Sequence, residues 1–115
     1  MSQERITRRL DDLLRIGAEA SYLVKKGKPA YLANTMDGAL LRDAGERILI
    51  KVATVAEKLP DDYKAARPDV DWTGISRMRN LVAHHCGLIN GDLLWQALAA
   101  RIPKLLKRQG IDGGG

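Results

Sequence analysis

The sequence has few aromatic residues and a single cysteine. It contains two tryptophans, three tyrosines and no phenylalanine, so the core must be built from Leu, Ile, Val and Ala. Small aliphatic side chains favour helices packed closely on helices. Cys86 stands alone, which excludes an intrachain disulfide. The 115 residues fit one domain, and we expect residues 1–109 to fold and the glycine-rich tail 110–115 to be flexible.

Long apolar runs are also missing. No segment approaches the roughly 18 apolar residues that a membrane span requires, and the charged stretch from Met1 to Leu10 lacks the apolar region of a signal peptide. We therefore expect a cytoplasmic protein that does not engage a membrane. The 19 Lys and Arg outnumber the 14 Asp and Glu, for a net charge of +5. This surplus favours a polyanionic partner only weakly, because positive charge also serves solubility.

Apolar residues recur at helical spacing along most of the chain and predict an all-α fold. We expect helices over about 3–26, 34–59, 71–84 and 91–109, with 61–71 as a connection that has room for one helical turn. Two long helices would then pair antiparallel, in an up-down bundle of four to five helices. The residues expected to face inward in the first two helices are Ile6, Leu10, Leu13, Leu14, Gly17, Ala20, Leu23, Val24, Met36, Leu40, Leu41, Ala44, Ile48, Val52, Val55 and Leu59.

Two local features qualify this pattern. Gly38 and Gly45 weaken the second helix by up to about 1 kcal/mol each relative to Ala, and we expect them to allow a close approach of another backbone. Pro103 lies inside the last helix and predicts a kink there. The inward residues of the last two helices are expected to be Ile75, Met78, Leu81, Val82, Leu94, Ala97, Leu98, Ile102, Leu105 and Leu106.

Polar residues concentrate between Arg77 and Cys86. Asn80 and His84 are four residues apart and share a helix face, so the Asn80 amide can fix the imidazole ring. Arg79 and His84 are five apart and diverge by about 140° on one helix. A second copy of the helix, related by a two-fold axis, could bring both residue types onto one phosphate. The spacing therefore indicates a composite site in a homodimer.

Histidine and arginine together suit RNA cleavage by the neighbouring 2′-OH. The reaction needs proton transfer to and from oxygen, which histidine performs near neutral pH. It also needs fixed positive charge at the phosphate, which the arginine fork supplies. Neither a metal nor a cofactor is required. The 2′-OH would restrict the activity to RNA and leave 2′,3′-cyclic phosphate ends.

Ordinary structural roles compete with this interpretation. On composition and spacing alone, a histidine at a helix C-terminus is more often a cap or a solvated residue than a catalyst. A metal site at His84, His85 and Cys86 is disfavoured, because adjacent residues on a helix do not converge and a fourth ligand is missing. Cys86 alone is typical of a small buried residue. Four further arginines favour a solvated face, with RNA binding as the alternative: Arg5, Arg8, Arg9 and Arg15.

The segment Asp71-Trp72-Thr73-Gly74-Ile75-Ser76-Arg77-Met78-Arg79-Asn80-Leu81-Val82-Ala83-His84 resembles the HepT-like branch of the HEPN superfamily. Members carry a Trp, an Ile and a Met-Arg-Asn that lead into R-x-x-x-x-H. The likeness extends from about Arg5 to Gln109 and includes the helix before Pro60 and the internal Pro103. It implies an all-α homodimer with a cleft lined by paired Arg79 and His84.

The resemblance also implies a function. The protein would be the toxin of a toxin–antitoxin pair, a metal-independent endoribonuclease that cleaves tRNA or mRNA. An MNT-type nucleotidyltransferase encoded alongside would be the antitoxin. Arg79 and His84 would be catalytic, Asn80 supporting, and His85 an additional imidazole.

One position departs from the family pattern. Members often continue as R-x-x-x-x-H-x-Y, and this tyrosine can be adenylylated by the antitoxin, whereas here the position is Cys86. A thiol is a poor stable acceptor of AMP, which puts regulation by modification in doubt. The alternative function is a non-catalytic helical dimer that binds the nucleotidyltransferase or nucleic acid without cutting. A plain helical bundle with no RNA role is the third interpretation.

Overall fold

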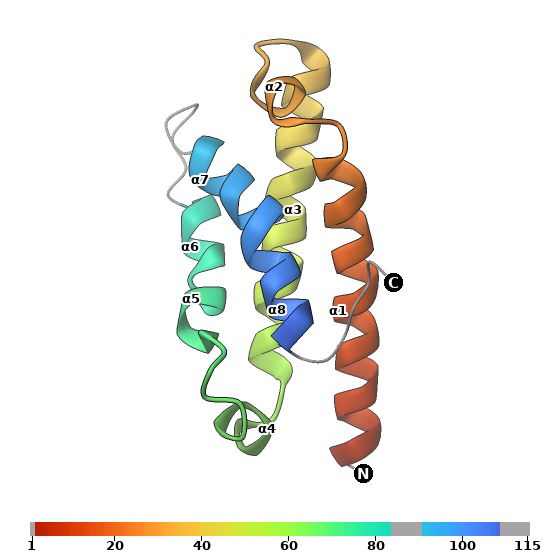
Figure 1. Cartoon of the computed structure of the whole chain (residues 1–115), viewed down its shortest axis with the longest axis vertical. Coiled ribbons are helices and arrows are strands. Elements are labelled where there is room, and N and C mark those ends of the chain that lie inside the picture. Colours follow the sequence, from red (N-terminus) through yellow and green to blue (C-terminus); the bar gives the residue numbers. More distant parts are fainter. Residues whose placement is uncertain (1, 84–90, 109–115) are drawn as a thin grey trace.

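The computed structural model describes residues 2–83 and 91–108, and within these ranges the chain is helical and contains no strand. The elements are α1 (Ser2–Val24), α2 (Lys28–Leu32), α3 (Met36–Lys58), α4 (Asp61–Ala65), α5 (Trp72–Ser76), α6 (Met78–Ala83), α7 (Gly91–Gln96), the π-helical segment η1 (Ala97–Arg101) and α8 (Ile102–Arg108). Figure 1 shows α1 and α3 running in opposite directions, α5 and α6 returning along α3, and α7 to α8 descending again. The predicted up-down helical bundle is confirmed.

A short helix, α2, lies between the two long ones and was not predicted. Gly27 precedes it with a φ of 94°, a conformation open to glycine without steric cost, and Pro29 stands in its first turn, where a missing N–H costs nothing. Arg42 then reaches back from α3, and its Nη1 donates to the carbonyls of Tyr31 and Ala33 at 2.8 Å each. These bonds satisfy acceptors at the end of α2 and fix it to α3.

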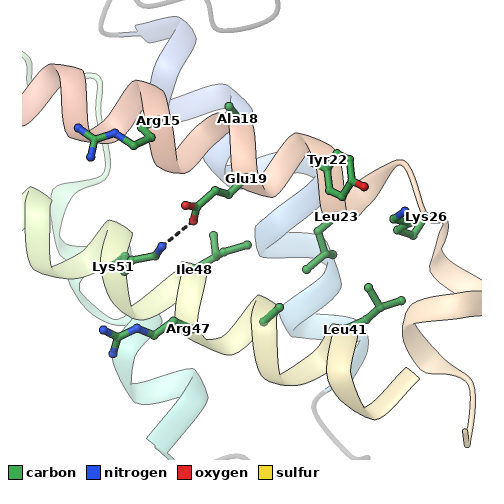
Figure 2. A pocket seen from close by; sticks show the side chains of 11 residues that line it. Arg15, Ala18, Glu19, Tyr22, Leu23, Lys26, Leu41, Arg47, Ile48 and Lys51 are labelled. Atoms are coloured by element: carbon green, nitrogen blue, oxygen red, sulfur yellow. Dashed lines mark hydrogen bonds and ion pairs between the residues drawn. The ribbon is translucent and has the colours of Figure 1, made fainter. Parts of the chain in front are cut away.

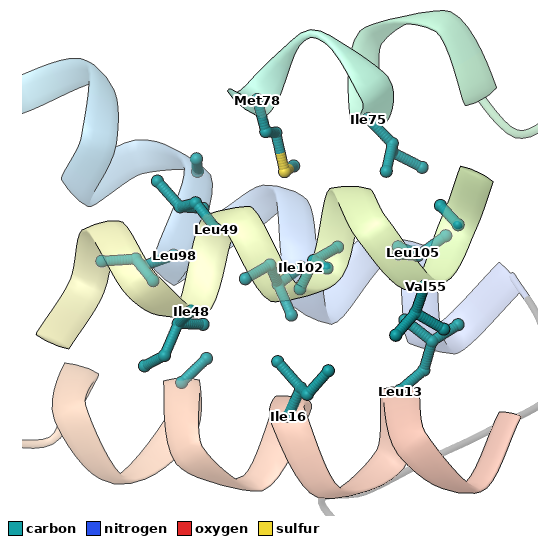
Figure 3. Close-up of a cluster of buried hydrophobic side chains, with 14 of the residues drawn as sticks. Leu13, Ile16, Ile48, Leu49, Val55, Ile75, Met78, Leu98, Ile102 and Leu105 are labelled. Carbon is teal, nitrogen blue, oxygen red and sulfur yellow. The ribbon is translucent and has the colours of Figure 1, made fainter. Parts of the chain in front are cut away.

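The core surrounds α3, which is buried on more than one side. This helix packs against α1 and α2, and also against α5, α6, α7 and η1. Figure 3 shows Ile48 and Val55 toward α1, and Leu49 toward the Met78 side. Leu49 is fully buried although it lies outside the predicted apolar stripe. A helix at the centre of a bundle needs two buried faces, and the single-stripe prediction was wrong in this respect.

Four residues expected to face inward are exposed, one of which is Ala44 of α3. Met36 is 77% exposed and Leu40 is 60% exposed, both in the first two turns of α3, and Leu14 of α1 is 39% exposed. Helical spacing placed them on the apolar face of their helices, but it could not show that the neighbouring helices leave these positions uncovered. Every inward residue predicted for the last helix is buried, from Leu94 to Leu106.

Both glycines of α3 allow close contacts, but the predicted approach of another backbone is found only at Gly38. A Cβ on Gly38 would collide with the backbone carbonyl oxygen of Ala33. A Cβ on Gly45 would lie 2.8 Å from Leu98 Cδ1 and 3.1 Å from Tyr31 Cε1. The approach at Gly38 is thus to backbone, whereas Gly45 accommodates core side chains.

The third predicted helix is divided in two. Asp71 caps α5 by accepting a hydrogen bond from Gly74 N at 2.9 Å, as expected from its position. At Arg77 the helix is interrupted, and α6 begins with Met78. The preceding connection contains the short helix α4 and is anchored by Trp72, whose indole N–H donates to the carbonyls of Lys64 at 3.1 Å and Arg67 at 3.2 Å.

The irregularity expected near Pro103 takes the form of the π-helical segment η1, which ends two residues before the proline. Proline cannot donate a backbone hydrogen bond, and its ring crowds the preceding turn. None of the described helices combines the length and the apolar character needed to cross a bilayer.

Tyr31 is a polar group enclosed by the core. Its side chain is fully buried, its ring lies 5.3 Å from that of Trp95, and its hydroxyl has no hydrogen-bond partner among residues 2–83 and 91–108. Burial, with the nearby charge of Glu46, raises the pKa of Tyr31 to about 12. Between pH 10 and 12 the unfolded chain would release a proton that the folded protein retains, so stability should fall as the pH rises through this window.

Tyr31→Phe should therefore leave the free energy of unfolding at pH 7 unchanged or raise it by up to about 1 kcal/mol, because it removes an unpaired buried hydroxyl. Above pH 10 the advantage of the variant should grow by at most about 1.4 kcal/mol per pH unit. Urea denaturation of both proteins at pH 7 and pH 11 measures the difference. A loss of more than 1 kcal/mol at pH 7 would show that the hydroxyl is paired in solution.

Candidate functional site

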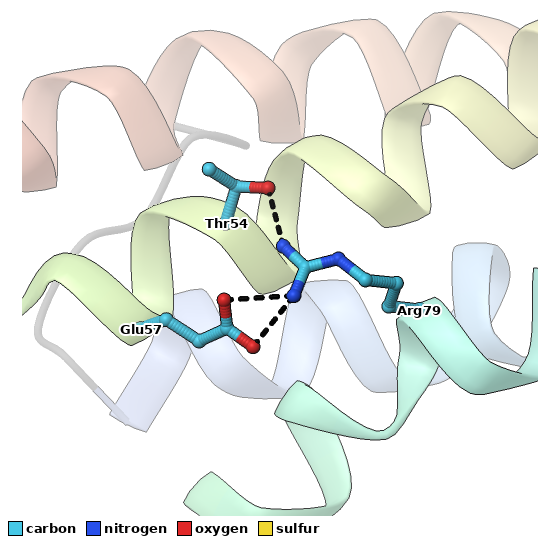
Figure 4. Close-up of polar contacts among 3 residues, drawn as sticks. All are labelled: Thr54, Glu57 and Arg79. Carbon is cyan, nitrogen blue, oxygen red and sulfur yellow. Dashed lines mark hydrogen bonds and ion pairs between the residues drawn. The ribbon is translucent and has the colours of Figure 1, made fainter.

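Arg79 is fixed against α3 by three polar contacts. Its Nη1 donates to both carboxylate oxygens of Glu57 at 2.8 Å, and its Nη2 donates to Thr54 Oγ1 at 2.7 Å. Figure 4 shows the guanidinium reaching from α6 to these two side chains. Because Thr54 and Glu57 lie three residues apart on one helix, their side chains project from the same face and together define the position of the guanidinium.

The ion pair leaves Arg79 able to bind a further anion. Arg79 and Glu57 side chains are 41% and 40% exposed, so the site is accessible from solvent. A guanidinium has five N–H groups, and the contacts with Thr54 and Glu57 engage at most three of them. An exposed ion pair contributes little to stability, and its value here is to hold a charged fork in one orientation.

Of the other predicted site residues, only Asn80 lies in the part of the chain that the structure describes. Asn80 follows Arg79 on α6 and is exposed. His84, His85 and Cys86 lie outside the residues that the structure describes, since α6 is described only to Ala83. The pairing of Asn80 with His84, and the composite arrangement of Arg79 and His84, stay predictions.

Sequence reasoning missed Thr54 and Glu57. A signal was present, because four polar residues interrupt the otherwise apolar stretch from Ile48 to Leu59 at helical spacing: Lys51, Thr54, Glu57 and Lys58. That spacing marks a polar face on a buried helix, but it does not say which partner covers it. In the described part of the chain, no three His, Cys, Asp or Glu side chains are grouped as a metal site would require.

A groove runs between α1 and α3 and reaches this site. Figure 2 shows its upper part, which is the end nearer to α2 in Figure 1. There Leu23, Leu41 and Ile48 form an apolar floor, and the ion pair of Glu19 with Lys51, 2.6 Å long, crosses between the helices. The next hollow along the helices is more polar. It is lined by Asp12, Arg15, Ile16, Glu19, Arg47, Ile50, Lys51, Thr54 and Val55. Thr54 therefore faces the groove while its hydroxyl accepts a hydrogen bond from Arg79.

Comparison with known proteins gives one family and three relatives. A family model described as ribonuclease HepT-like matches residues 6–108. A protein of Methanocaldococcus jannaschii, named provisionally as an RNase, is 30% identical over 61 residues, which are 53% of this chain and 50% of the relative. A second protein with that provisional name, from Caldanaerobacter subterraneus, is 23% identical over 90 residues, which are 78% of this chain and 80% of the relative.

The third relative, from Thermococcus cleftensis, is named provisionally as ribonuclease HepT. It is 27% identical over 59 residues, which are 51% of this chain and 54% of the relative. The matches to the two archaeal proteins thus span about half the length of each relative. No solved structure gives a significant match.

Proposed function

Because the chain belongs to the ribonuclease HepT-like family, we propose that it is an endoribonuclease and the toxin of a toxin–antitoxin pair. The observation that carries the proposal is the orientation of Arg79, whose guanidinium is held by Thr54 and Glu57 and keeps donors available at a solvent-accessible site. The RNase names of the three relatives support the same activity.

The proposed reaction needs no metal. A histidine accepts the proton of the 2′-OH, and the oxygen attacks the adjacent phosphorus while the bond to the 5′-oxygen breaks. A second imidazole protonates the leaving oxygen. Arg79 contacts the non-bridging oxygens, where charge builds up in the transition state. The products are a 2′,3′-cyclic phosphate and a 5′-OH. His84 is the proposed proton-transfer residue, with Asn80 orienting it and His85 in an auxiliary role.

We further propose that the site is completed by a second copy of the chain. One α-helix directs Arg79 and His84 about 140° apart, so a cleft between two protomers is the simplest way to bring both onto one phosphate. The partner that restrains the toxin would be an MNT-type nucleotidyltransferase. Cys86 takes the place of the tyrosine that such a partner modifies, so restraint here would depend on binding rather than on stable adenylylation.

Cleavage of RNA in the presence of EDTA tests this function. The purified protein should cut a single-stranded RNA in excess EDTA, and mass spectrometry should find 3′ ends one water lighter than a linear phosphate. A 2′-O-methyl RNA of the same sequence should stay intact, because it lacks the attacking hydroxyl. Activity that is lost in EDTA and restored by a divalent metal would overturn the mechanism. A protein that binds the RNA and never cuts it would support the non-catalytic alternative.

A further inference from the structure

A cluster of four basic side chains lies between the N-terminal part of α1 and the C-terminal end of α3. Arg5, Arg8 and Arg9 come from α1 and Lys58 from α3, and together they line a hollow of about 470 Å³. We propose that this basic cluster is a phosphate-binding subsite that holds the RNA strand next to the Arg79 site. The inference rests on the proposed ribonuclease function and adds to it a substrate surface outside the catalytic motif.

The charge of the basic cluster is available to a ligand. Arg5, Arg8 and Lys58 are exposed and form no ion pair with the residues that the structure describes. Of the four, Arg9 alone has an ion pair there, with Asp12 at 3.7 Å. Like charges that share one hollow repel each other, and an anion placed among them relieves that repulsion. Cations gathered from two helices are therefore suited to a polyanion.

The lining of the hollow favours phosphates over bases or a protein surface. All four residues that line it carry positive charge, and none is aromatic or aliphatic. Bases are bound by stacking on aromatic side chains, whereas phosphates are bound by Lys and Arg. The upper part of the α1–α3 groove differs, because Leu23, Leu41 and Ile48 give it an apolar floor. The basic cluster thus matches the backbone of a nucleic acid.

The position of the basic cluster links it to the catalytic arginine. Lys58 follows Glu57, whose carboxylate binds Arg79. Lys58 also lies four residues after Thr54, about 6 Å along the axis of α3, and Thr54 binds Arg79 and lines the groove. A strand whose scissile phosphate lies at Arg79 can therefore extend over α3 and place a neighbouring phosphate at the basic cluster.

The test removes three charges from the cluster and compares the result with an equal loss of charge elsewhere. The test variant is Arg5→Gln/Arg8→Gln/Lys58→Gln. The matched control is Lys25→Gln/Lys104→Gln/Lys107→Gln, whose three exposed residues do not line the α1–α3 groove. Fluorescence anisotropy measures the affinity of each protein for a labelled single-stranded 2′-O-methyl RNA over a series of salt concentrations. Cleavage of the unmodified RNA and sedimentation velocity are recorded on the same preparations.

The test variant should bind the RNA about tenfold or more weakly than wild type near 0.1 M salt. Its slope of log affinity against log salt should be shallower by about 2, since each lost phosphate contact on a single strand contributes about 0.7. The control should keep at least most of the wild-type slope. Equal slopes in the two variants, with wild type still cleaving RNA, would overturn this inference and leave the proposed function intact.

Two other outcomes are distinguishable. A wild-type protein that neither binds nor cleaves RNA would overturn the proposed function, and the inference with it. A test variant that binds RNA normally but changes its sedimentation coefficient would show that the basic cluster contacts protein, which also contradicts the phosphate subsite.

Discussion

Arg79→Ala and His84→Ala should each reduce RNA cleavage by a factor of about 10²–10³ or more and abolish toxicity. Arg79 meets negative charge that grows only in the transition state, and losing such a donor typically has an effect of this size. His84 would lose the proton-transfer group. The fold should survive in the Arg79 variant, because the ion pair with Glu57 is about 40% exposed on both sides and such pairs contribute about 1 kcal/mol or less. Cleavage assays and urea denaturation measure the two effects.

His85→Ala is the internal control and should lose far less activity than His84→Ala. If His85→Ala is inactive and His84→Ala cuts normally, the assignment of the catalytic histidine is wrong even though the ribonuclease function stands. If all three variants match a wild-type protein that only binds RNA, the non-catalytic dimer is the correct interpretation.

Mixed dimers test whether each centre draws on two chains. A dimer of one Arg79→Ala chain and one His84→Ala chain, purified through two different affinity tags, would contain one centre with both residues intact if they come from opposite protomers. Such a dimer should recover up to half of the wild-type activity. Failure to recover activity in the purified mixed dimer would contradict the composite site.

Leu49→Ala should lower the free energy of unfolding by about 2–5 kcal/mol, the range for removing a buried leucine side chain. Leu49 is fully buried at the centre of α3, between helices that come from both halves of the chain. Domains of this kind are stable by only about 5–15 kcal/mol, so the loss is a large share of the total. Urea denaturation monitored by circular dichroism measures it.

Leu40→Ala is the matched control for this substitution. It makes the same chemical change in the same helix, but Leu40 is 60% exposed, so the cost in a monomer should be within about 0.5 kcal/mol. The difference between the two variants then reports burial rather than helix propensity. A large loss in Leu40→Ala would contradict the exposure of this position in solution.

Much of the bundle could be predicted because local patterns determine helices. The long helices and the cap at Asp71 follow from spacing and composition, and so does the inward face of the last helix. The burial of Leu49 could not be predicted in this way, since periodicity within one segment cannot count the neighbours that will surround it. The break at Arg77 was also missed, because no Gly or Pro stands between Ile75 and Val82 to mark it.

The candidate site likewise contains one residue that local sequence identifies and two that only the tertiary structure brings to it. Arg79 was identified from its distance to His84 along the chain, which is a local property. Thr54 and Glu57 are 25 and 22 residues away in sequence, and only the packing of α6 on α3 brings them to Arg79. The orientation of a charged side chain is thus a tertiary property, and a motif alone does not contain it.

The π-helical segment η1 has a consequence for the phase of the last helix. Leu94, Leu98, Ile102 and Leu106 are all buried and follow one another in three steps of four residues. In an ideal α-helix each step overshoots a full turn by about 40°, so the buried row would wind about 120° around the axis. The wider turn of η1 holds more residues and unwinds part of that drift. The segment therefore keeps the row in register, so that Leu106 still arrives opposite Gly17, where no side chain competes for the space.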